Sequence, residues 1–313
     1  MSKTIDNQVD VYLEDDFKFD KNVSDDLETI SRESLTYWQD AFRRLKKNKA
    51  AIASCIILIL MIVMTIIGPY ISGYSYTEVD PMARNQTPSA EHWFGTDSLG
   101  RDLFARTWIA GRVSMAIGVI GALVNITVGL IYGGVAGYIG DGADKLMMRI
   151  VEVIGSVPKM LVIILISMIL KPTLTSLILA LTLTGWIGAA RMVRSQVLQL
   201  KNFDFVHASI ALGSSPWRII KKHMFPNVMS TLIIITTLTV PGLIFAEAFL
   251  SFIGLGIQSP NTSWGAMCAE SQQMILFYPY QLLVPTILIS ITMLCFNLLG
   301  DGLRDALDPK LRK

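Results

Sequence analysis

The sequence predicts an all-α membrane protein with six transmembrane helices and both termini in the cytoplasm. Three observations lead to this prediction. Of the 313 residues, 52% are hydrophobic and only 17% are charged, whereas a soluble domain carries about a quarter charged residues. The apolar residues gather in runs of about the 20 residues that a helix needs to cross a bilayer. Basic residues concentrate in alternate connecting segments, which indicates the orientation of the spans.

The segment before the first span has two predicted parts. Residues 1–34 are acidic and show no apolar period, so we predict a disordered cytoplasmic tail. Residues 35–49 place Trp38, Phe42 and Leu45 at helical spacing and end in a basic cluster. This pattern predicts an amphipathic helix in the cytoplasmic headgroup layer. A juxtamembrane cluster of basic residues on the cytoplasmic side explains the pattern equally well.

The apolar runs predict six spans, and their even number places both termini on one side of the membrane. The spans are 50–72, 113–138, 146–170, 174–193, 228–253 and 282–300. The resulting divisions are 50–112 (first span and outer loop), 113–300 (transmembrane core, with a cytoplasmic loop at 194–227) and 301–313 (cytoplasmic C-terminal tail). We predict no cleavable signal peptide, because the first apolar run begins only near residue 50.

Small residues follow one another at four-residue intervals along the second predicted span. They are Gly121, Asn125, Gly129, Gly133 and Gly137. Such a stripe lets another helix backbone approach closely. We interpret the stripe as packing within this chain, with a face beside a membrane pathway as the alternative.

The sequence lacks the residue sets of common enzymes and metal sites. Its three histidines, His92, His207 and His223, form no HExxH pattern and no Ser-His-Asp arrangement. The three cysteines are far apart, and no glycine pattern matches a phosphate-binding loop. We therefore predict no enzymatic activity, no metal site and no cofactor in this chain. The net charge of +2 gives no reason to expect nucleic acid as a partner.

A glutamate, a lysine and a proline inside the predicted spans are of particular interest. Glu247 is about 28 Å along the fifth span at the helical rise, and such a group faces protein or water rather than lipid. It either lines a gate or caps the turn at 254–256. Pro158 predicts a kink in the third span, and we interpret Lys159 beside it as a snorkelling lysine. Glu247, Pro158 and Asn125 are the candidate gate or pathway residues.

The loop between the fourth and fifth spans reads "FVHASIALGSSPWRIIKKHMFPN". Gly213 is suited to end a short helix, and Ser215 followed by Pro216 is a typical start for a second one. Pro226 and Asn227 predict a break before the fifth span. We predict two short helices joined by a turn on the cytoplasmic face. From the residues alone, a passive amphipathic connector explains the loop as well as a docking element does.

This loop resembles the cytoplasmic signature of ABC importer permeases, which has Glu-Ala-Ala, three residues, a glycine, and then an isoleucine and a proline. The matching or adjoining residues here are His207, Ala208, Ser209, Gly213, Arg218, Ile219, His223, Pro226 and Asn227. His207 stands where the family has an acidic or amide residue, and Ser209 replaces the second alanine. We interpret His207 as a tolerated surface substitution rather than a pH sensor.

Three further blocks resemble the C-type permease subunits of dipeptide and oligopeptide ABC importers, a family that includes nickel-uptake members. They are "HWFGTDSLGRDLFAR" (92–106), "EAFLSFIGLGIQSPNTSWG" (247–265) and "FNLLGDGLRDALDPKLR" (296–312). The resemblance runs from about residue 40 to the C-terminus and leaves out the acidic tail.

The resemblance implies a multi-pass permease subunit in a bacterial plasma membrane. Its expected partners are a homologous B-type permease, two ATP-binding subunits and an external peptide-binding protein. ATP and Mg²⁺ are then bound by the partners, and the loop 204–227 sits in a cleft of one ATP-binding subunit. The alternatives are an ion-coupled secondary transporter and a nickel rather than a peptide permease.

The outer loops supply candidate docking residues for the binding protein. They are Asp97, Arg101, Asp102 and Trp264. For Asp97 and Arg101 we favour ion pairing within the loop over docking.

Overall fold

The computed structural model describes residues 36–308, and the regular elements of this part are helical. The predicted disordered tail, 1–34, lies outside the described residues. The packed helices belong to a compact unit that begins at residue 41. The elements are α2 (Tyr37–Lys47), α3 (Lys49–Ile71), η2 (Pro81–Ala83), α4 (Leu103–Ile139), α5 (Asp141–Gly155), α6 (Lys159–Ile169), α7 (Leu174–Thr182), α8 (Ile187–Lys201), α9 (Asp204–Ala211), α10 (Pro216–Ile219), η3 (Ile220–Met224), α11 (Phe225–Phe252), α12 (Trp264–Ser271), η4 (Gln272–Met274) and α13 (Pro279–Leu307).

Within the described residues, four helices are long and apolar enough to cross a membrane. They are Lys49–Ile71, Leu103–Ile139, Pro216–Phe252 and Pro279–Leu307, and two bent helix pairs raise the number of spans to six if each pair crosses once. The second span was expected to start at 113, but α4 begins at Leu103. It begins there because Asp102 caps it, accepting a hydrogen bond from the backbone N–H of Ala105 at 2.8 Å.

Two bent helix pairs occupy the positions where the third and fourth spans were predicted. α5 and α6 meet at 74°, and the break is at Pro158, so the predicted kink is confirmed. α7 and α8 meet at 47°, and α8 continues to Lys201, beyond the end expected at 193. The prediction ended too early because polar residues follow 193, while the helix continues by packing one face on α4.

The predicted break before the fifth span is wrong. α10, η3 and α11 form one helical stretch, Pro216–Phe252, that passes through Pro226. The π turn η3 explains how the helix continues, since the N–H of Phe225 bonds to the carbonyl of Ile220, five residues back. One extra residue in the turn changes the hydrogen-bond register where proline supplies no N–H.

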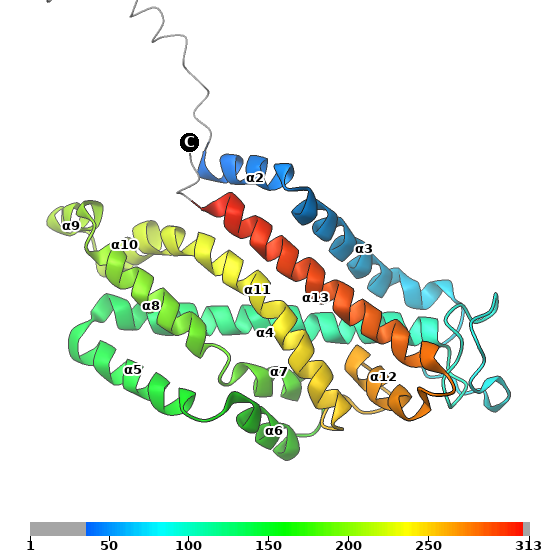
Figure 1. Cartoon of the computed structure of the whole chain (residues 1–313). Helices are drawn as coiled ribbons and strands as arrows, with labels where there is room; N and C mark the ends of the chain where they lie inside the picture. Colours follow the sequence, from blue (N-terminus) through cyan, green and yellow to red (C-terminus); the bar gives the residue numbers. More distant parts are fainter. Residues whose placement is uncertain (1–35, 309–313) are drawn as a thin grey trace, which may run out of the picture. The chain divides into compact units, whose positions relative to one another are not determined.

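Among the described helices, α4 and α8 make the most extensive contact, and Figure 1 shows α8 crossing α4. A Cβ on Gly129 would lie 2.5 Å from the Cβ of Ala189, and a Cβ on Gly133 would clash with the carbonyl oxygen of Ala190. The glycine stripe of α4 therefore lets the backbone of α8 come into direct contact. This confirms the interpretation of the stripe as packing within the chain.

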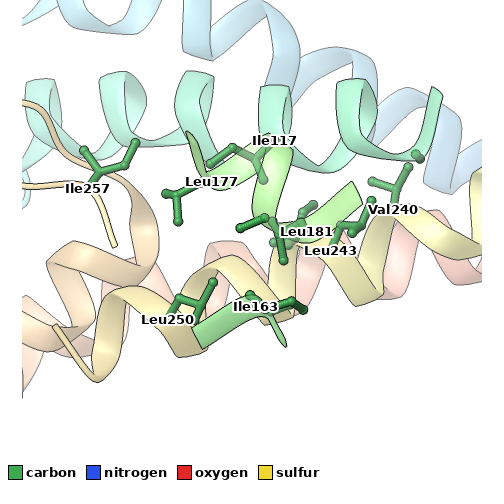
Figure 2. Packing of buried hydrophobic residues seen from close by; sticks show 12 residues of the cluster. Ile117, Ile163, Leu177, Leu181, Val240, Leu243, Leu250 and Ile257 are labelled. Carbon is green, nitrogen blue, oxygen red and sulfur yellow. The ribbon is translucent and has the colours of Figure 1, made fainter. Parts of the chain in front are cut away.

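Apolar side chains from α4, α6, α7 and α11 form the first core cluster. Figure 2 shows Ile117 of α4 facing Leu177 and Leu181 of α7, with Leu243 of α11 beside them and Ile163 of α6 completing the group. α7 and α8, on the two sides of one bend, and α6, on one side of the other, all contribute to core clusters, so these segments are part of the packed structure.

Gly133→Ala tests the contact between α4 and α8. The added methyl group should force the two backbones apart and lower the free energy of unfolding by about 1–3 kcal/mol, the usual cost of overpacking. Gly134→Ala is the matched control, because a Cβ there has nothing within 4 Å, and alanine favours the helix. Thermal unfolding of the purified protein in detergent compares them, and equal midpoints for both variants would contradict the proposed contact.

Candidate functional site

The segment 204–227, here called the hairpin, contains α9, a turn, α10 and η3. α9 ends where Gly213 adopts a φ of +75°, and the N–H of Ser214 bonds to the carbonyl of Ser209 at 3.0 Å. Ser215 then caps α10 through the N–H of Arg218 at 3.4 Å, with Pro216 in the first turn. The glycine stop and the Ser-Pro start predicted from sequence are both confirmed.

The hairpin is attached to the bundle by three buried side chains. Val206, Ile219 and Met224 have at most 2% of their surface exposed. They join a cluster with Val193 of α8 and Val228 of α11. Apolar contacts, and not the turn alone, therefore join the hairpin to α8 and α11.

The remaining surface of the hairpin is apolar and basic. Leu212 is 86% exposed and Trp217 is 71% exposed, and Phe205 and Ile210 are also exposed. Basic side chains follow them on the same segment: Arg218, Lys221 and Lys222, all exposed. Gathered apolar side chains at a surface mark a contact with another protein or a membrane.

The signature residues divide between this surface and the inside of the hairpin. His207, Ala208, Gly213, Arg218 and Pro226 are exposed, and Ile219 is buried. Two more signature residues, His223 and Asn227, form hydrogen bonds within the hairpin. His223 Nε2 lies 3.2 Å from Ser209 Oγ, and the side-chain amide of Asn227 donates to the carbonyl of His223 at 2.6 Å.

The loop between α3 and α4 ends in an ion-pair network whose arginines are buried. Arg101 Nε lies 2.6 Å from Asp97 Oδ2, which confirms that these two pair within the loop. Arg101 and Arg106 both also bond to Glu270 of α12, at 2.8 and 2.7 Å. Sequence reasoning missed Glu270, although it is the one carboxylate in the segment 254–281 and faces a loop rich in arginine.

The other two candidate docking residues are also internal. Asp102 caps α4 and lies 2.9 Å from His92 Nδ1. Trp264 is fully buried, and its indole N–H donates to the carbonyl of Thr107 at 2.9 Å. These side chains hold the shape of the loops, so a partner would contact other residues on their surface.

Glu247 is fully buried in α11 and faces protein, as its depth predicted. Its carboxylate accepts hydrogen bonds from Ser114 of α4 at 2.9 Å and from Ser251 at 2.7 Å. The Ser114 hydroxyl oxygen accepts in turn from the backbone N–H of Trp264 at 3.1 Å. Three elements, α4, α11 and α12, thus meet at one carboxylate, and the serines that bond to it were not predicted.

The other two candidate pathway residues lie at the two helix bends. Pro158 stands at the break between α5 and α6. Asn125 is 3% exposed and lies against Gly185, between α7 and α8. Within the described residues, neither amide atom of Asn125 has a hydrogen-bond partner. The same part of the chain contains no group of three His, Cys, Asp or Glu residues placed to hold a metal ion.

Two family models match consecutive parts of the chain. Residues 98–313 match the binding-protein-dependent transport system inner membrane component. Residues 36–88 match the N-terminal TM domain of oligopeptide transport permease C.

Several curated proteins are similar over nearly their whole length. The dipeptide transport system permease protein DppC of Bacillus subtilis (strain 168) is 50% identical over 298 residues, which covers 95% of this chain and 93% of the relative. The oligopeptide transport system permease protein OppC of the same organism is 47% identical over 288 residues, 92% and 94% of the two chains. OppC of Escherichia coli (strain K12) is 41% identical over 294 residues, 93% and 96%.

A solved structure supports the fold. A chain of the inward-facing MetNI methionine ABC transporter matches with a TM-score of 0.52 at 20% identity, covering 64% of this chain and 96% of that chain. At this identity the match shows the fold alone.

Glu270→Gln tests the ion pairs of the two buried arginines. Removing the shared carboxylate leaves Arg101 and Arg106 with less compensation, so we expect the free energy of unfolding to fall by about 1–3 kcal/mol. Glu152→Gln is the control, because it breaks an exposed pair with Arg149 that is worth about 0.5 kcal/mol or less. Thermal unfolding in detergent at low and high salt measures both, and an equal effect of the two substitutions would contradict a stabilising role of Glu270.

Proposed function

The chain belongs to the family of binding-protein-dependent transport system inner membrane components, and from this premise we propose that it is the C-type permease subunit of an ABC importer for dipeptides or oligopeptides. The proposed substrate class is based on sequence identity. The chain is 50% identical to a dipeptide permease and 47% identical to an oligopeptide permease, over more than nine-tenths of each chain. The chain itself is not catalytic, and ATP with Mg²⁺ belongs to partner subunits.

The hairpin is the element through which an ATP-binding subunit acts. Its exposed apolar side chains, Leu212 and Trp217 foremost, fit a cleft on that subunit, and Arg218, Lys221 and Lys222 give it a positive rim. Closure of the ATP-binding subunits moves the hairpin, and the buried contacts of Val206 and Ile219 pass the movement to α8 and α11. The permease then has two states whose balance ATP binding shifts.

This mechanism places the hairpin and both termini in the cytoplasm. The distribution of basic residues supports that orientation. A homologous B-type permease forms the other half of the pathway, and two ATP-binding subunits bind, one at each permease. Asn125, Pro158 and Glu247 remain our candidates for the gate and pathway of this chain.

The loop between α3 and α4 is the surface for the external binding protein. Four buried residues stabilise the conformation of this surface: Asp97, Arg101, Asp102 and Trp264. A polar cavity of about 170 Å³ opens beside them, with the exposed carboxylates of Glu78 and Glu91 on its wall. A basic side chain of the binding protein matches this charge.

α2 lies in the cytoplasmic headgroup layer of the membrane. Phe42 is exposed, and the ammonium of Lys46 lies 4.6 Å from the centre of its ring. Basic residues beside exposed aromatic side chains suit an anionic lipid surface.

The source of energy is the first test. We expect the complex reconstituted in liposomes to import a labelled dipeptide or oligopeptide when ATP is present on the hairpin side, and to continue when ionophores collapse the ion gradients. Uptake that stops with the gradients while ATP remains would support an ion-coupled transporter instead. Import of Ni²⁺ but not of peptides would redirect the assignment to metal uptake.

Gly213→Val tests the docking role of the hairpin. Valine at a φ of +75° costs roughly 1–2 kcal/mol of backbone strain, so the turn should rearrange and co-purification of the ATP-binding subunits should fall. Gly142→Val is the control, because a Cβ at that glycine meets open space and its φ is not positive. Both variants should insert into the membrane normally, and unchanged co-purification of Gly213→Val would refute the docking surface.

A further inference from the structure

Asn125 of α4 lies against the break between α7 and α8. The small-residue stripe of α4 contacts α8 along its length, and Gly129, one turn further along α4, meets Ala189 of α8. Asn125 itself meets Gly185, where an added Cβ would lie 2.5 Å from Asn125 Oδ1. Gly185 is part of the break, because α7 ends before it and α8 begins after it. The interface therefore places the amide of Asn125 on the bend and not on regular helix.

The backbone at this break has lost the regular hydrogen bonds of an α-helix. The N–H of Gly185 bonds to the carbonyl of Thr182 at 3.3 Å, and the N–H of Ile187 bonds to the carbonyl of Thr184 at 3.5 Å. Both bonds reach only three residues back, and both are longer than the usual distance of about 2.9–3.0 Å. In the described part of the chain, the buried Thr184 Oγ1 has no hydrogen-bond partner. The break thus contains polar groups that a neighbouring side chain can bond.

The amide of Asn125 is such a neighbour, yet it forms no hydrogen bond in this arrangement. Asn125 is 3% exposed, and within residues 36–308 neither Nδ2 nor Oδ1 has a partner. A buried amide without partners destabilises the arrangement that contains it, whereas a small apolar side chain would not. Close packing of the helices alone therefore favours glycine or alanine here. Polar groups that break this rule in a native fold are expected at functional positions.

A small shift of α8 is enough to give Asn125 its partners. Its amide already touches Gly185, so orientation and not distance prevents the hydrogen bonds. Helix shifts of about 1–2 Å are usual in conformational transitions. Val193 of α8 belongs to the same apolar cluster as Val206 of the hairpin. In the proposed mechanism, a displacement of the hairpin therefore reaches the helix that starts at this break.

We propose that Asn125 is a positioning residue for transport, whose amide bonds to the break at Thr184 and Gly185 only after α8 has shifted. This inference rests on the proposed function. Nδ2 can donate to a backbone carbonyl or to the threonine hydroxyl, and Oδ1 can accept from a backbone N–H. Because the arrangement in this structure lacks these bonds, the amide stabilises the second arrangement relative to the first. It thereby sets the balance that ATP binding shifts.

Asn125→Ala in the whole complex, with the partner permease and the ATP-binding subunits, tests the proposal by thermal unfolding in two states. Without nucleotide the midpoint should change little, because the lost packing is offset by removal of an unpartnered buried amide. With a non-hydrolysable ATP analogue the midpoint should fall below that of the unmodified complex, because the second arrangement loses its hydrogen bonds. An equal fall in both states would show a packing role alone and overturn the proposal.

Peptide uptake measures the consequence for transport. ATP-dependent uptake into liposomes by Asn125→Ala should fall about tenfold, a change of about 1.4 kcal/mol that one or two hydrogen bonds supply. Asn125→Ser leaves nearly the same space as alanine but retains a donor and an acceptor, so its uptake should exceed that of Asn125→Ala. Equal uptake by the two variants, or unchanged uptake by Asn125→Ala, would contradict the proposed hydrogen bonds.

Thr292→Val is the matched control, because it removes a buried hydroxyl that already donates to the carbonyl of Leu288 at 2.7 Å. It should lower both midpoints by a similar amount and leave uptake within about twofold. If the unmodified complex imports no peptide, the proposed function fails, and this result is distinct because it appears without any substitution. The two unfolding midpoints need no peptide, so they still test the hydrogen bonds of Asn125 in that case.

Discussion

The close approach of α4 and α8 is the constraint on which the rest of the structure depends. Gly129 and Gly133 leave no side chain between the two helices, so backbone lies on backbone. α4 also packs against α3, α11 and α7, whereas α8 leads directly into the hairpin. In the proposed mechanism, α4 is thus the fixed reference against which α8 moves. Because packed helices fill their contacts at crystal-like density, such a movement is a change between two arrangements rather than a gradual deformation.

In the proposed mechanism the hairpin carries force, and its internal contacts keep it folded. Val206 and Ile219 join it to α8 and α11 through apolar contacts, and His223 links η3 to α9 through Ser209. The π turn removes the break that Pro226 would otherwise cause, so the helix from Pro216 continues into α11. A continuous helix transmits displacement along its axis, which a flexible connector does not. The continuous helix therefore supports the mechanical coupling that the family resemblance implies.

Charged residues inside the bundle fall into three physical situations. Arg101 and Arg106 are neutralised by carboxylates, and their network joins α12 to the start of α4. Glu247 is surrounded by hydroxyl groups that satisfy its oxygens, and it joins the same elements. Both arrangements are complete within the chain and act as structural joints. Arg191 has an exposed guanidinium and no ion pair within residues 36–308.

The sequence by itself determined the apolar spans, the capping residues and the position of turns, because these depend on nearby residues. The start of α10 at Ser215 and Pro216, the turn at Gly213 and the kink at Pro158 were all predictable for that reason. Only the tertiary structure decided which distant groups meet: Glu270 with Arg101, Ser114 with Glu247, and Asn125 with Gly185. It also decided that α8 continues past its apolar run and that Pro226 does not interrupt α11. Helix ends and charge partners are set by packing between elements far apart in the chain, and periodicity along the sequence carries no information about that packing.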